Sequence, residues 1–228
     1  MSKRYSRNIA VIGEDGQRRL RESSVLVIGC GALGGQCAME LAGSGVGKIG
    51  LVDFDTIDLS NLQRQLFFRE SEAGKMKAAI IAERIRALNS DVEICVYTHL
   101  LTSKNFGEIA AEYDFVEECT DNAATKLLVE QECRRLSKAC CIGGVAGWRG
   151  QLTTMADGRG GMAQYFPDMA QEADGLLPCA IEGVMAPTAA MIASLQAAEA
   201  IKYLTGKGEL LIDSLQAIDI ANNLYIKI

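Results

Sequence analysis

The sequence predicts an α/β protein, with a Rossmann-like, mostly parallel sheet covered by helices on both faces and continued by an antiparallel C-terminal part. Strand-like apolar segments alternate with helix-like segments through the first 144 residues. A glycine-rich turn joins the first strand to the next helix. Beyond Gly144 the alternation stops, and short strand-like segments surround one long helix.

The first part of the chain alternates helix and strand in a regular order. Helices are expected over 15–22, from the glycine turn to Ser44, over 75–89, in a tail beginning near Glu108, and over 123–137. Strands are expected over 23–28, 48–55 and 92–98, in a segment ending at Thr120 and Asp121, and over 139–144. Strands alternating with helices in this way form an open sheet with right-handed crossovers.

The second part departs from that pattern. A strand is expected over 147–155, a helix over 184–205, and short strands over 208–214, 217–220 and 223–228. Residues 156–180 are rich in Gly, Ala and Asp without a clean period, which predicts a long loop, and loops of this length are usually functional or disordered. With 228 residues we expect one domain, 1–228, made of a nucleotide-binding part, 1–144, and a second part, 145–228.

Composition limits the classes of function. A net charge of −6 provides no broad basic surface for nucleic acid or an anionic membrane. The polar start "MSKRYSRN" resembles neither a signal peptide nor an anchor, and the longest uncharged run, Gly183 to Ala198, is shorter than the ~20 residues that span a bilayer. The eight cysteines form no C-x-x-C pair, so we expect mostly reduced core thiols in a cytoplasmic protein.

The glycine turn has the spacing of a dinucleotide-binding fingerprint. "GCGALG" places Gly29, Gly31 and Gly34 after a strand and at the start of a helix, and Asp53 follows at the end of the next strand. Glycines allow close approach of the backbone to a ligand, and the carboxylate can accept hydrogen bonds from ribose hydroxyls. At this point a dinucleotide dehydrogenase fits as well as an ATP-binding enzyme.

Further polar residues follow the strands. Asn61, Arg64 and Lys77 come after the second strand, and Asp121 ends the fourth. Lys77 alone could be an exposed lysine at a helix start, and Asp121 alone could be a helix N-cap. Because ligand groups gather at the carboxyl ends of parallel strands, two cations and a carboxylate able to hold a divalent cation describe a triphosphate site better than a nicotinamide site.

Several motifs in order give the sequence a family resemblance. "RYSRN", "GCGALGG", "DFDTIDLSNLQRQ", "GKMK", "ECTDN" and "CAIEGVMAP" resemble those of the MoeB/ThiF-type adenylyltransferases, relatives of ubiquitin-activating enzymes, from Arg4 to about Gly206. The resemblance implies a homodimer that uses Mg-ATP to adenylate the C-terminal glycine of a small ubiquitin-fold sulfur carrier. Such carriers, ending in Gly-Gly, serve thiamin, molybdopterin or related sulfur-transfer pathways.

The resemblance also implies a role for each motif residue. Gly29, Gly31 and Gly34 would surround the nucleotide, Asp53 would bind ribose, Asn61, Arg64 and Lys77 would contact the phosphates, and Asp121, with Asn122 beside it, would hold Mg. Arg7 would enter the site of the partner subunit. Cys179 matches a cysteine that forms a thioester or acyl disulfide with the carrier in some relatives, and residues 145–228 would bind the carrier.

The sequence departs from the family in two ways. Many relatives bind a structural zinc through two C-x-x-C pairs, but no cysteine lies within 161–166 or beyond the last helix, so no zinc of this type is expected. The lobe that zinc usually pins is expected to be held by packing alone or to be mobile. We also expect no appended rhodanese-like domain, and therefore a separate protein as the sulfur donor.

Three alternatives stay open at this stage. A tRNA-modifying cyclodehydratase of the same superfamily would need a basic surface, which the net charge of −6 does not support. An NAD-dependent oxidoreductase leaves Arg64 and Lys77 without a role. A catalytically silent binding module would have no use for the intact nucleotide motifs. The carrier and the pathway are not identified by the sequence.

Overall fold

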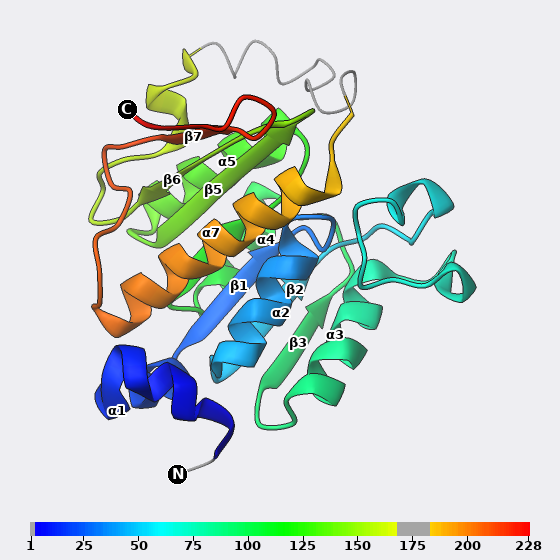
Figure 1. Cartoon of the computed structure of the whole chain (residues 1–228), viewed down its shortest axis with the longest axis horizontal. Coiled ribbons are helices and arrows are strands. Elements are labelled where there is room, and N and C mark those ends of the chain that lie inside the picture. Colours follow the sequence, from blue (N-terminus) through cyan, green and yellow to red (C-terminus); the bar gives the residue numbers. More distant parts are fainter. Residues whose placement is uncertain (1–2, 168–182) are drawn as a thin grey trace.

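An eight-stranded mixed sheet forms the centre of the chain in a computed structural model, which describes residues 3–167 and 183–228 (Figure 1). The strands are β1 Ser24–Ile28, β2 Lys48–Val52, β3 Glu93–Tyr97, β4 Phe115–Glu118, β5 Ala139–Ala146, β6 Arg149–Met155, β7 Gln216–Asp219 and β8 Leu224–Lys227. Their order is β3-β2-β1-β4-β5-β6-β7-β8. Pairing is parallel from β3 to β5 and antiparallel from β5 to β8, which confirms the predicted fold class.

Helices cover both faces of the sheet. They are α1 Ser6–Glu22, α2 Gly34–Ser44, α3 Lys77–Leu88, α4 Ser103–Ala110, α5 Ala123–Arg135 and α7 Ala186–Thr205. Short 3₁₀ turns are η1 Lys3–Tyr5, η2 Leu59–Asn61, η3 Glu70–Glu72 and η4 Met162–Gln164. Helices α2, α3 and α7 lie on one face, and α4 and α5 on the other (Figure 1). No helix within the described ranges is both long and apolar enough to pass through a lipid bilayer.

Each face of the sheet has its own apolar core, and β1 contributes to both. Val25 and Val27 pack towards α2, α3 and α7, whereas Leu26 and Ile28 pack towards α4 and α5. All four side chains are at most 2% exposed. A strand that is buried on both faces is apolar at consecutive positions, which is why "SVLVI" shows no polar alternation.

Two predicted elements were wrong: one helix is longer than expected, and one expected strand does not form. Helix α1 begins at Ser6 rather than near Asp15 and bends at Gly13, whose φ is +76°. Its first half has no fully buried residue and therefore lacks the apolar stripe from which a helix is recognised. Segment 208–214 is not a strand, because positive φ values at Gly208 (+91°) and Asp213 (+51°) bend it away, leaving one isolated bridge to β6.

A carboxyl group lies in the core beneath the sheet. Glu117 on β4 is 0% exposed, and its Oε2 accepts a hydrogen bond of 3.3 Å from Nε2 of Gln196 on α7. Among the described residues its Oε1 has no hydrogen-bond partner. Burial raises the pKa of Glu117 well above its usual value, and the nearby Cys119 and Glu199 raise it further. Burial therefore favours the protonated, neutral form of this side chain in the folded protein.

This burial predicts a pH-dependent cost in stability. Above the ordinary glutamate pKa of about 4.3 the unfolded chain releases the proton that the folded chain retains, so Glu117 destabilises the fold increasingly as pH rises. Glu117→Gln removes the ionisation. We expect the difference in melting temperature between the variant and the wild type to be more positive at pH 8 than at pH 4. The exposed control Glu83→Gln should show little change in this difference between the two pH values. An equal difference at both pH values would contradict a buried neutral carboxyl.

Candidate functional site

A cavity of about 890 Å³ opens at the carboxyl ends of the parallel strands and gathers most of the predicted site residues. The predicted residues that line it are Gly29, Gly31, Asp53, Asn61, Arg64, Lys77, Asp121 and Asn122. They all come from the segments that follow β1, β2 and β4, including the first residue of α3. Grouping residues by their position at the carboxyl ends of parallel strands therefore predicted the proximity of residues up to 93 positions apart in the sequence, from Gly29 to Asn122.

The glycine turn is shaped by contacts that no side chain would permit. Gly29 has a φ of +87°, and a Cβ on Gly34 would lie 1.8 Å from the Gly29 carbonyl oxygen. These two glycines allow the chain to leave β1 and enter α2 at once. A Cβ on Gly31 would approach only Nε2 of Gln65, at 3.5 Å, so the backbone here faces the open cavity. A ligand can approach the turn closely at Gly31.

The Asp53 carboxylate joins the ends of the first two strands. Its Oδ2 accepts a hydrogen bond of 2.6 Å from the backbone N–H of Cys30, and its Oδ1 accepts one of 2.7 Å from that of Asp55. Burial raises the pKa of Asp53, while these two bonds and the charge of Lys77 act in the opposite direction. Asp53 thus ties the glycine turn to β2 and presents its carboxylate at the cavity.

Both predicted cations, Lys77 and Arg64, are among the cationic side chains that line the cavity. Lys77 begins α3, and its side chain is 10% exposed, with Nζ 2.9 Å from Oδ2 of Asp55. Arg64 donates from Nη1 to the carbonyl oxygen of Ser60 at 3.0 Å and also lines the cavity. The Asp55 partner was not anticipated from the sequence. An anionic ligand would meet the Lys77 and Arg64 charges on the same side as the glycine turn.

Asn61 and Asn122 both accept hydrogen bonds from backbone N–H groups at the edge of the cavity. Asn61 Oδ1 accepts from the N–H of Asp58 at 3.1 Å in the capping box of η2. Asn122 Oδ1 accepts from the N–H of Thr125 at 2.8 Å and caps α5. The N-cap role considered for Asp121 therefore belongs to its neighbour, and Asp121 lies before the helix at the cavity.

Of the predicted site residues that the structure describes, Gly34 and Arg7 do not line the cavity, and Gly34 instead begins α2 close to the Gly29 carbonyl oxygen. Arg7 lies on the exposed start of α1, and this region contacts the far ends of α2 and α3: Asn8 Nδ2 donates to the Ser44 carbonyl at 3.1 Å. The cavity lies at the opposite, N-terminal end of α2. Within one chain Arg7 is thus remote from the cavity. Cys179 lies outside the described residues.

The structure adds cavity residues that sequence reasoning did not assign. They include Gln65, Thr120, Thr125, Lys126, Arg149, Gln151, Met162 and Phe166. Lys126 had a recognisable pattern: it follows the helix N-cap Asn122 by four positions, which returns it to the cavity side of the first turn. Met162 and Phe166 had none, because their loop lacks periodicity.

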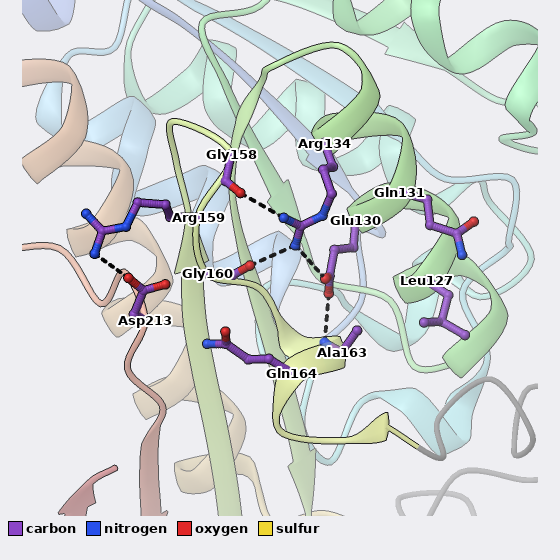
Figure 2. Close-up of a pocket in the computed structure, with 10 residues that line it drawn as sticks. All are labelled: Leu127, Glu130, Gln131, Arg134, Gly158, Arg159, Gly160, Ala163, Gln164 and Asp213. Atoms are coloured by element: carbon purple, nitrogen blue, oxygen red, sulfur yellow. Dashed lines mark hydrogen bonds and ion pairs between the residues drawn. The ribbon is translucent and has the colours of Figure 1, made fainter.

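Polar contacts from α5 hold the described start of the predicted long loop (Figure 2). The Glu130 carboxylate, 3% exposed, accepts hydrogen bonds from the N–H groups of Met162 (2.8 Å) and Ala163 (3.0 Å). Arg134 pairs with Glu130 and donates to the carbonyls of Gly158 (2.9 Å) and Gly160 (2.8 Å). The expectation of packing alone was wrong for residues 158–163, because a buried carboxylate and a guanidinium satisfy the loop backbone.

This loop and the segment after α7 lie where the family resemblance would place the two halves of a zinc site. An ion pair between Arg159 and Asp213 joins this loop to the segment after α7 (Figure 2). Within residues 3–167 and 183–228, no three His, Cys, Asp or Glu side chains lie close enough together to hold a metal ion.

The Glu130 contacts predict a large cost for removing the carboxylate. Glu130→Ala leaves two N–H groups and the Arg134 charge without their buried acceptor, which should lower the free energy of unfolding by about 3 kcal/mol. Glu132→Ala on the same helix is the matched control. It loses an i,i+3 ion pair with the half-exposed Arg135 and should cost under ~1 kcal/mol. Equal losses in chemical denaturation would show that Glu130 is not a structural anchor.

The glycine turn, the carboxylate at the end of the next strand and the cations at the sheet edge define a nucleotide-binding protein of the Rossmann type. The ThiF family model matches residues 5–227. The chain belongs to the ThiF family.

Named relatives share more than a third of their aligned residues with this chain. It is 38% identical over 223 residues to "Adenylyltransferase and sulfurtransferase MOCS3-1" of Zea mays, covering 94% of this chain and 47% of that protein. It is 36% identical over 222 residues to "Probable adenylyltransferase/sulfurtransferase MoeZ" of Mycobacterium tuberculosis, covering 95% and 57%. The chain therefore spans about half the length of these relatives.

Solved structures share the fold at lower identity. MccB of E. coli, determined with ATP, superimposes with a TM-score of 0.86 at 23% identity, covering 100% of this chain and 71% of that one. PaaA superimposes with a TM-score of 0.82 at 20% identity, covering 100% and 74%. The fold of these structures thus extends through the whole described chain, including the antiparallel strands after β5.

Proposed function

We propose that the chain is an ATP-dependent adenylyltransferase that activates the C-terminal glycine of a small ubiquitin-fold sulfur carrier in the cytoplasm. The observation that carries this proposal is the gathering of Arg64, Lys77 and Asp121 around the glycine turn in one cavity. The names of the MOCS3 and MoeZ relatives support the reaction class. Thiamin, molybdopterin or a related sulfur-transfer pathway would use the product, and a separate protein would donate the sulfur.

The residues present fit ATP and magnesium. Asp53 offers carboxylate oxygens for ribose hydroxyls, beside a turn that is open at Gly31. Arg64 and Lys77 offer positive charge for the phosphates. Asp121 offers one carboxylate, which suits Mg²⁺ because this ion is commonly held by one or two carboxylates together with substrate phosphates. Bound Mg-ATP would supply the electrophilic α-phosphorus and the pyrophosphate leaving group.

The chemistry needs positioning and charge neutralisation rather than a general base. A carboxylate oxygen of the carrier attacks the α-phosphorus, the bond to the pyrophosphate oxygen breaks, and an acyl-adenylate and pyrophosphate result. The attacking carboxylate is already ionised at neutral pH. Since both reactants are anionic, Arg64 and Lys77 would act by reducing their repulsion. The one histidine, His99, is exposed after β3 and does not line the cavity.

The far side of the cavity suits a flexible glycine tail. Gly144, Val145 and Ala146 line it at the end of β5. Next to them, Arg149 and Gln151 on β6 also line the cavity. Small side chains leave room for an extended backbone, and the polar pair provides partners for its carbonyl or carboxylate groups. We infer that the carrier tail enters here and that Cys179, if it forms an adduct, acts after adenylation.

Carrier-dependent exchange of labelled pyrophosphate into ATP tests the proposed reaction. Lys77→Ala and Asp121→Ala should each reduce exchange by roughly 10²-fold or more, because a charge contact to the reacting phosphates typically contributes a few kcal/mol. Lys104→Ala, an exposed lysine on α4, is the control and should retain exchange. Tight NAD binding, with no exchange for any carrier ending in Gly-Gly, would refute the proposal.

A subunit-mixing experiment tests whether Arg7 acts in a partner's site. We propose a symmetric dimer, because Arg7 is exposed and remote from the cavity of its own chain. Arg7→Ala and Asp121→Ala should each be nearly inactive alone. After equal mixing and random exchange, about half the dimers are heterodimers with one intact site each, so about a quarter of wild-type activity returns. No recovery after verified subunit exchange would reject the trans role.

A further inference from the structure

A buried lysine lies in the wall of the cavity without a role in the scheme above. Lys126, in the first turn of α5, is 6% exposed. Its ammonium pairs with the Glu118 carboxylate at the end of β4 and donates to the Gly143 carbonyl of β5 at 2.6 Å. One side chain therefore joins α5 to the carboxyl ends of two neighbouring strands.

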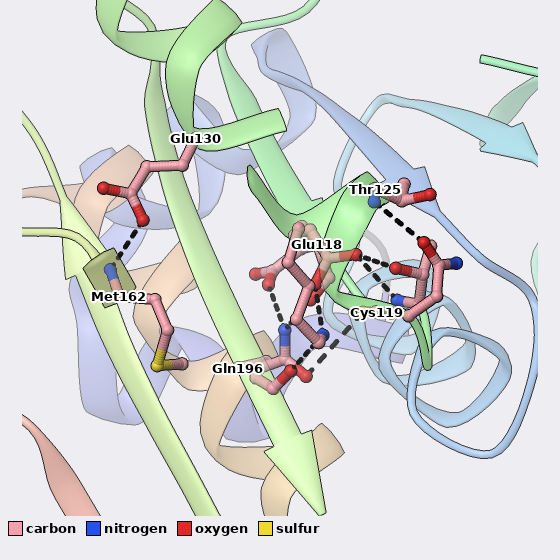
Figure 3. Close-up of polar contacts among 11 residues, drawn as sticks. Glu118, Cys119, Thr125, Glu130, Met162 and Gln196 are labelled. Atoms are coloured by element: carbon pink, nitrogen blue, oxygen red, sulfur yellow. Dashed lines mark hydrogen bonds and ion pairs between the residues drawn. The ribbon is translucent and has the colours of Figure 1, made fainter. Parts of the chain in front are cut away.

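The other half of the pair reaches the turn that carries Asp121. Glu118 is 0% exposed, and its Oε1 accepts hydrogen bonds from both the backbone N–H (2.9 Å) and the hydroxyl of Thr120 (Figure 3). The backbone carbonyl of Glu118 accepts a 2.9 Å bond from Nε2 of Gln196 on α7 (Figure 3). The Glu118 carboxylate thus holds Thr120, while Gln196 of α7 holds the Glu118 backbone.

The charge arrangement separates this lysine from Lys77. The Lys77 partner, Asp55, has a side chain that is 55% exposed, whereas the Lys126 partner is fully buried. A cation already neutralised by a buried carboxylate adds little net charge to the cavity. Breaking such a pair to contact a phosphate would leave Glu118 buried and uncompensated, which is costly. The geometry therefore favours a fixed pair over a second phosphate ligand.

We propose that Lys126 is a positioning residue: through Glu118 and Thr120 it sets the placement of Asp121, and so the coupling between magnesium and ATP. This inference rests on the proposed function. Thr120 directly precedes Asp121, and both line the cavity. Losing the lysine would let Glu118 and the turn shift while Asp53, Arg64 and the glycine turn stay in place.

Calorimetric titration of the full chain with ATP, with and without Mg²⁺, tests this directly. In Lys126→Met the gain in ATP affinity that Mg²⁺ provides should fall about 10-fold, as for residues that support metal ligands. ATP affinity without Mg²⁺ should change less than about 3-fold. Lys126→Arg keeps the charge and should restore most of the gain, and the exposed control Lys104→Met should match the wild type.

Two further variants keep the test decisive if the unpaired Glu118 prevents folding. Glu118→Gln/Lys126→Met removes both charges together and should lose the same Mg²⁺ gain. Thr120→Val removes only the hydroxyl contact at the cavity and should lose part of it. A wild-type Mg²⁺ gain in these variants would overturn the inference, as would a large loss of ATP affinity without Mg²⁺. A wild-type protein that binds no ATP would instead overturn the proposed function.

Discussion

The hydrogen bond from the Cys30 N–H to the Asp53 carboxylate, 2.6 Å long, is the contact on which the candidate site depends. It joins the ends of β1 and β2 just where the chain turns through Gly29. The same carboxylate holds the N–H of Asp55, and Asp55 in turn pairs with Lys77 at the start of α3. A single partly buried carboxylate thus connects the glycine turn to Lys77 of the next crossover, at the edge of the sheet where parallel strands place ligands.

Helix α5 performs the corresponding task on the other side of the cavity. Lys126 and Glu130, four residues apart, lie on one buried face of the helix. The first reaches the turn before Asp121 through Glu118, and the second holds the backbone of Met162, which lines the cavity. Each half of the cavity is therefore held by charged groups with hydrogen-bonded or ion-paired partners, so that the loops place their side chains at defined positions.

The fold and part of the site could be predicted because their causes are local or periodic. Alternating apolar segments predicted the parallel sheet, and the strand-end rule placed Lys77 and Asp121 in one cavity. The Lys126–Gly143 and Glu130–Met162 contacts span 17 and 32 positions, and no local pattern encodes such pairs. Helix α1 was only half predicted because its first turns bury little. The roles of Arg7 and Cys179 depend on a partner subunit and a carrier, and remain predictions.

The proposed function requires that this cavity hold Mg-ATP. A crystal structure of the chain with magnesium and a non-hydrolysable ATP analogue would show this. We expect ribose hydroxyls on Asp53, phosphates beside Arg64 and Lys77, and the metal on Asp121. A nucleotide bound elsewhere, or bound here with its phosphates away from both cations, would contradict it.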